Sequence, residues 1–168
     1  EEVRQDIKEV SSLVGGTFRL NLHETYGDFG NAFVDRDEVG PEHFKSWMEW
    51  GKENGFKLDF NSTSFSHPKS GYLTLSNPDK GIRDFWIEHT KRCRRIADAM
   101  GKYQDDPCIM NIWIHDGSKD YTVERYRYRA ILKESLDDIL AEQLPNMKSC
   151  LEAKLFGIGI EAYTVGSH

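Results

Sequence analysis

Apolar residues recur along this chain with two spacings, and the two spacings alternate. Spacings of three and four residues between Val3 and Leu13 are typical of one face of an α-helix, whereas the β-prone run 17–23 is typical of a strand. Gly15-Gly16 separates the two and predicts the end of the helix. The same signals predict helices over 3–13, 41–54, 78–101 and 123–140, and strands over 17–23, 56–60, 108–114 and from Cys150 onward.

The connections between these elements differ in length according to their direction. Links from a helix to the next strand are short, whereas the strand-to-helix links Glu24 to Gly40 and Asn61 to Asn77 are about seventeen residues long. Long strand-to-helix loops form the active-site face of a (β/α)₈ barrel. A doubly wound sheet also alternates, but its nucleotide-binding versions carry G-x-G-x-x-G after the first strand, which this chain lacks.

The sequence therefore predicts an α/β fold that is part of a (β/α)₈ TIM barrel, with four consecutive units. A complete barrel takes about 250 residues, and four strands cannot close the cylinder. We expect residues 1–168 to form a single partial domain. Gly157-Ile158-Gly159 is predicted to be a tight turn rather than a fragment of a nucleotide-binding loop.

Composition and charge narrow the class of partner. A net charge of −6 and a pI near 5.5 argue against nucleic acid or an anionic membrane and favour a small polar substrate. The apolar runs fall far short of the roughly 20 residues that cross a bilayer. Three cysteines without a C-x-x-C pairing, and no visible signal peptide, lead us to expect a cytoplasmic protein.

Polar residues stand in same-face pairs near the carboxyl ends of the expected strands. Buried in a barrel, such groups are costly unless they pair with each other, with a metal or with a ligand. Trp47, Trp50 and Trp86, by contrast, have helical spacing and are interpreted as core residues. The four pairs are Asn21 with His23, Asp59 with Asn61, Asn111 with Trp113, and Glu152 with Lys154.

Structural roles compete with functional ones at these positions. His23 is interpreted first as a hydrogen-bonded structural histidine, and Asp59 as equally a structural or a functional group. Glu152 and Lys154 form either a mutually neutralising ion pair or part of a reaction site, and the strand pattern favours the site.

Two further residues lie where a ligand would meet the protein. From its loop position alone, His67 is interpreted as a surface histidine. Trp113 lies at a strand end, where its ring suits an aromatic wall for a sugar.

At these residues the chain resembles the L-rhamnose isomerase family. The likeness runs from Arg19 to Ser167. It rests on several motifs in the family's order, and together these identify the family far more specifically than any one motif does. The motifs are Leu20-Asn21-Leu22-His23, Leu58-Asp59-Phe60-Asn61, Phe65-Ser66-His67-Pro68, Asn111-Ile112-Trp113-Ile114 with Asp116-Gly117, and Glu152-Ala153-Lys154-Leu155-Phe156-Gly157-Ile158-Gly159.

The resemblance implies a xylose-isomerase-like barrel that interconverts L-rhamnose and L-rhamnulose. It also implies two divalent ions, commonly manganese, with zinc or cobalt as alternatives, and a homotetramer. By this resemblance Glu152 matches a carboxylate ligand of the structural metal, and Lys154 a catalytic lysine that reaches substrate oxygen. His67 matches the histidine near the sugar's ring oxygen, and Trp113 a residue of the pocket wall.

The resemblance is incomplete. The first strand of the family's barrel and the metal ligands on its later strands have no counterpart in this sequence, so the 168-residue chain is expected to be inactive alone. Two interpretations remain open: a segment of an L-rhamnose isomerase, or a non-catalytic half-barrel used for binding or assembly. A mass measurement separates them, because the second requires a chain of 19.4 kDa.

Overall fold

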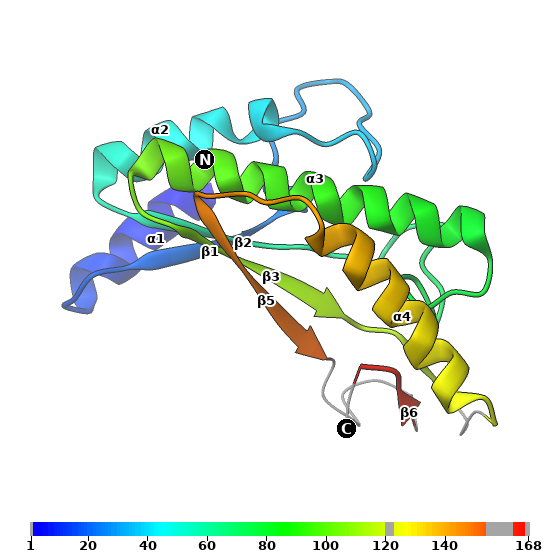
Figure 1. Cartoon of the computed structure of the whole chain (residues 1–168). Coiled ribbons are helices and arrows are strands. Elements are labelled where there is room, and N and C mark those ends of the chain that lie inside the picture. Colours follow the sequence, from blue (N-terminus) through cyan, green and yellow to red (C-terminus); the bar gives the residue numbers. More distant parts are fainter. Residues whose placement is uncertain (1, 120–122, 154–162, 167–168) are drawn as a thin grey trace.

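The computed structural model describes residues 2–119, 123–153 and 163–166, and it alternates helices with strands as the sequence predicts (Figure 1). Gly157-Ile158-Gly159, interpreted above as a tight turn, lies outside the described residues. The elements are α1 (Glu2–Leu13), β1 (Arg19–His23), η1 (Glu24–Tyr26), η2 (Pro41–Phe44), α2 (Lys45–Asn54), β2 (Lys57–Asn61), α3 (Lys80–Gln104), β3 (Cys108–Ile114), β4 (Gly117–Ser118), α4 (Arg125–Leu140), β5 (Met147–Ala153) and β6 (Tyr163–Thr164).

Four strands form a parallel sheet in the order β1-β2-β3-β5. Each strand therefore lies beside the next long strand in the chain, and a helix occupies each connection. The expected parallel α/β arrangement is confirmed. The short antiparallel pair β4-β6 was not predicted, because two-residue strands leave no periodicity to detect.

Helices α2 and α3 cover one face of this sheet, as Figure 1 shows, and α4 packs against α3. On β3 the exposure alternates strictly: Met110 and Ile112 are fully buried under the helices, whereas Asn111 and Trp113 on the opposite face are half-buried. Trp47, Trp50 and Trp86 are buried in this core, as expected. The alternation follows from the two-residue period of a strand.

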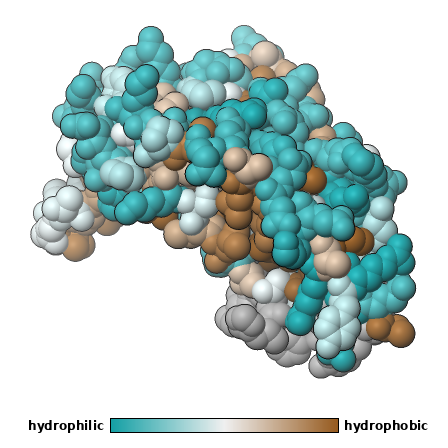
Figure 2. Space-filling model, in the orientation of Figure 1, coloured by the Kyte–Doolittle hydropathy of each residue, from teal (hydrophilic) through white to brown (hydrophobic). Residues whose placement is uncertain are grey.

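The opposite face of the sheet has no helix over it among the described residues (Figure 1). Hydrophobic side chains gather in the middle of the view in Figure 2, where Figure 1 draws β3 and β5. On the helix-covered face, Leu151 of β5 is 54% exposed, although Ile112 beside it in register is fully buried. Within the described ranges, none of the helices combines the length and the apolar character needed to span a membrane.

The boundaries of α3 differ from the sequence prediction. The predicted helix starts at Pro78, but Asp79 caps the helix by accepting hydrogen bonds from the N–H groups of Gly81 and Ile82. The helix also continues through Gly101. A Cβ on Gly101 would lie 1.8 Å from the carbonyl oxygen of Asn146, so this glycine permits close packing rather than ending the helix.

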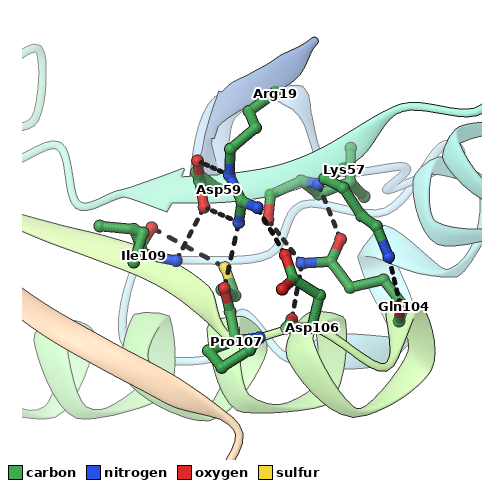
Figure 3. Close-up of polar contacts among 9 residues, drawn as sticks. Arg19, Lys57, Asp59, Gln104, Asp106, Pro107 and Ile109 are labelled. Atoms are coloured by element: carbon green, nitrogen blue, oxygen red, sulfur yellow. Dashed lines mark hydrogen bonds and ion pairs between the residues drawn. The ribbon is translucent and has the colours of Figure 1, made fainter. Parts of the chain in front are cut away.

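The amino ends of the strands are held by an ionic cluster (Figure 3). Arg19 binds Asp59 through two hydrogen bonds of 2.7 Å and reaches Asp106 at 2.5 Å. Asp59 also accepts a hydrogen bond from the N–H of Ile109 at 2.8 Å, which ties β2 to β3. The hydrogen bonds that Arg19 donates to Asp59 raise the pKa of Arg19, and the hydrogen bond that Arg19 donates to Asp106 lowers the pKa of Asp106. Asp59 is therefore a structural residue.

Candidate functional site

The carboxyl ends of the strands bring polar side chains together on the face without helices. His23, Asn61 and Asn111 stand in register on β1, β2 and β3. Two residues further along β3, Trp113 lies in register with Glu152 of β5. Residues far apart in the sequence therefore share one edge of the sheet, which is where ligands bind in parallel α/β folds.

Glu152 is exposed on this face and accepts a hydrogen bond from the side-chain amide of Asn111 at Oε2. An ionised carboxylate can only accept hydrogen bonds, so the amide must present its Nδ2 group to Glu152. The contact orients the carboxylate without adding a charge. Two of the predicted site residues, Glu152 and Trp113, are thus brought together by the fold.

Lys154 lies outside the described residues. The structure therefore tests neither its predicted catalytic role nor the alternative ion pair with Glu152.

Trp113 presents a half-buried ring beside Glu152. The ring of Phe65, from the loop after β2, meets it edge-on with centroids 5.6 Å apart and an interplanar angle of 86°. His115 packs on it at 5.8 Å. These contacts fix a rigid aromatic surface of the kind that suits the C–H groups of a sugar.

His67 is not the surface residue that its loop position indicated, because its side chain is only 12% exposed. Its ring stacks on Phe85 with centroids 4.9 Å apart. Its Nδ1 accepts a hydrogen bond from the N–H of Lys69 at 3.0 Å, so in the neutral ring Nε2 carries the proton. That nitrogen lies 3.0 Å from Asp35 Oδ1, which also accepts a hydrogen bond from the N–H of Arg36. Its aromatic and polar neighbours thus fix the position of the ring.

A hollow of about 220 Å³ lies beside this histidine and shares Asp35 with it. Glu24, which is 2% exposed, forms an ion pair with Arg36 in its wall. A buried carboxylate of this kind requires its cationic partner. The lining residues are Glu24, Thr25, Phe29, Val34, Asp35, Arg36 and Val39.

His23 follows the structural interpretation. Its Nδ1 lies 2.7 Å from the hydroxyl of Thr63, and burial lowers the pKa of the ring. The neighbouring Asn61 differs, because its Oδ1 is buried and has no hydrogen-bond partner among the described residues. A buried acceptor without a donor indicates a missing partner.

The described residues can supply part of a metal site. Within the described ranges, no group of three or more His, Cys, Asp or Glu side chains is placed to hold an ion. The carboxylate of Glu152 and the unpartnered Asn61 Oδ1 are nevertheless oxygen donors on one face, and such donors suit Mg²⁺, Mn²⁺ and Ca²⁺. The donor chemistry of these two oxygens fits a hard divalent ion.

Two contributors were not among the predicted site residues. Asn111 was placed on the face of Trp113, but its contact with Glu152 depends on the pairing of β3 with β5, which the sequence does not specify. Asp35 lies 32 residues before His67, and no spacing signal links them.

Comparison with known proteins gives a consistent result. Residues 1–168 match the model of the family described as L-rhamnose isomerase (RhaA). The chain is 68% identical over its whole length to L-rhamnose isomerase from Bacteroides thetaiotaomicron, and 50% and 49% identical to those from Mannheimia succiniciproducens and Listeria monocytogenes serotype 4a. In each case it spans 40% of the length of that relative.

Proposed function

Because the chain belongs to the L-rhamnose isomerase family, we propose that it is a segment of a metal-dependent enzyme that interconverts L-rhamnose and L-rhamnulose. The observation that carries this proposal is the placement of Glu152 against Trp113 at the carboxyl edge of a parallel sheet. A carboxylate next to an aromatic wall supplies an ion ligand and a sugar-binding surface at one place.

We propose that the four strands are consecutive units of a (β/α)₈ barrel related to that of xylose isomerases. Three features support this: the strands are parallel, the helices cover one face, and the long loops follow the strands. In a barrel, the face that carries Asn111, Trp113 and Glu152 would be the interior. The relatives are longer than this chain, so the rest of the parent protein would close the barrel.

We propose that Glu152 holds the structural ion, with manganese as the expected metal and zinc or cobalt as alternatives. A bound divalent ion supplies Lewis-acid polarisation of the substrate's carbonyl and hydroxyl oxygens. The further ligands would come from the remainder of the parent protein. Oxygen donors such as Glu152 favour manganese among these metals.

The chain's own residues would position the sugar. Trp113, held by Phe65 and His115, would pack on the sugar and exclude water from one side. His67, held by Asp35, would lie near the ring oxygen. Lys154 would stabilise negative charge on a substrate oxygen, a role proposed from the sequence motif.

We also propose a cytoplasmic homotetramer. Cys93 and Cys108 are buried free thiols and Cys150 is an exposed one, which suits a reducing compartment.

Replacing Glu152 with glutamine in the full-length protein tests the proposal. An amide carries no charge for the ion. Loss of a residue that only supports a metal ligand already lowers metal affinity or activity by about 10- to 100-fold. For the loss of the ligand itself, we therefore expect turnover and Mn²⁺ affinity to fall by about 100-fold or more. Calorimetric Mn²⁺ titration and a rhamnose assay measure both. Glu134→Gln on the exposed side of α4 is the matched control. Normal affinity and turnover in Glu152→Gln would exclude Glu152 from the site.

A further inference from the structure

Asn111 makes a side-chain contact that the proposed reaction does not use. Its amide donates a hydrogen bond to Oε2 of Glu152 across the β3–β5 pair. We infer that Asn111 is a positioning residue, which orients the carboxylate of Glu152 toward a divalent cation. This inference rests on the proposed role of Glu152 as a metal ligand.

The contact leaves Glu152 able to bind an ion. A carboxylate has about four lone-pair sites on two oxygens, and Asn111 occupies one of them on Oε2. This contact leaves Oε1 uninvolved. Groups that hold metal-binding carboxylates by hydrogen bonds determine the orientation of the ligand and its affinity for the ion.

Asparagine is well suited to this position because it is a neutral donor. An aspartate at position 111 would repel the carboxylate of Glu152, and a lysine would neutralise it and compete with the cation. An amide fixes the geometry and leaves the negative charge of Glu152 for the ion.

The backbone holds Asn111 more firmly than it holds Glu152. β3 lies between β2 and β5, and the carbonyl oxygen of Asn111 accepts hydrogen bonds from the N–H of Ser62 at 3.0 Å and from its hydroxyl at 3.4 Å. Glu152 is exposed, and within the described ranges the side chain of Glu152 makes one hydrogen bond, which Asn111 donates. A fixed donor therefore restrains a side chain that would otherwise sample several rotamers.

Asn111→Leu in the full-length protein tests the inference, because leucine has a similar shape and no donor. Calorimetric titration of the metal-free protein with Mn²⁺ should show an apparent Kd raised by about 10- to 100-fold. The thermal unfolding temperature of the metal-free protein should stay close to that of the wild type. Cys150→Ser is the matched control, because Cys150 lies beside Asn111 in register on the same face. It should bind Mn²⁺ as the wild type does.

The Glu152→Gln variant distinguishes a failure of the positioning role of Asn111 from a failure of the proposed metal-binding role of Glu152. If Glu152→Gln weakens Mn²⁺ binding and Asn111→Leu changes the Kd by less than twofold, the positioning role is wrong and the proposed function stands. If Glu152→Gln binds Mn²⁺ normally, Glu152 is not a ligand and the inference falls with it. Should Asn111→Leu fail to fold, Asn111→Ala replaces it, with the same expected loss of affinity and the same twofold limit.

Discussion

Asp116 anchors the loop that carries His67, and the structure allows the cost of disturbing it to be worked out. The carboxylate is fully buried just after β3. It accepts hydrogen bonds from the Thr74 hydroxyl at 2.5 Å, from the N–H of Ser76 at 2.7 Å and from the hydroxyl of Ser76 at 2.6 Å. Its backbone oxygen also accepts a hydrogen bond from the N–H of Val165 at 2.8 Å.

Asp116→Asn preserves the volume of the side chain but removes its charge and one acceptor. With the amide oxygen facing Ser76, the amide nitrogen must face the Thr74 hydroxyl, which then has to reverse its hydrogen bond. A hydrogen bond to a charged group contributes about 1 kcal/mol more than a neutral one, so three such bonds predict a loss of about 3 kcal/mol. That is a large part of the 5–15 kcal/mol that stabilises a typical protein.

Urea unfolding of the full-length protein measures the free energy, and hydrogen–deuterium exchange of the Ser76 N–H reports the loop itself. We expect an earlier unfolding midpoint and faster exchange at Ser76. Asp84→Asn makes the same chemical change at a side chain that is 52% exposed, and should cost less than about 0.5 kcal/mol. Equal unfolding midpoints for the two variants, with unchanged exchange at Ser76, would refute the reasoning.

Two further predictions concern other titratable groups. Burial lowers the pKa of His89 from 6.5 to about 4, so its contribution to stability is complete above pH 6.5. As the pH falls from 6.5 to 4, the unfolded state binds a proton that the folded state does not, and about 3 kcal/mol is lost. Urea unfolding between pH 7 and 4 measures this loss, and His89→Gln should flatten that part of the curve. A His89→Gln curve as steep as that of the wild type would contradict the assignment. Lys154→Met in the full-length enzyme should lower kcat more than it raises KM, because the proposed ammonium acts on charge that develops during the reaction. An unchanged kcat with a lower Tm would instead indicate a structural lysine.

The periodicity of the sequence was sufficient to predict the alternation of helices and strands. The strand 108–114 was predicted residue for residue, because β-prone side chains and flanking turn residues act locally. The end of the third helix was not, since the predicted helix ends at Gly101, whereas α3 continues to Gln104. Its role as a close-packing residue depends on the carbonyl of Asn146, which no local signal reveals.

The residues of the candidate site were also only partly predictable from the sequence. The two-residue period placed Asn111 and Trp113 on one face, and the motifs pointed to Glu152 as a functional residue. The sequence pattern left the role of Asp59 open, because Asp59, like Glu152, is a strand carboxylate with a polar neighbour two positions away.

The sequence by itself determined which elements form, which side chains share a face and which family the motifs resemble. The tertiary structure decided which polar groups satisfy one another. Asp59 pairs with Arg19, 40 residues away, and is structural, whereas Glu152 is exposed and, among the residues that the structure describes, contacts the amide of Asn111. Face and period follow from local backbone geometry, but hydrogen-bond partners depend on strand pairing between distant segments, which only the folded chain establishes.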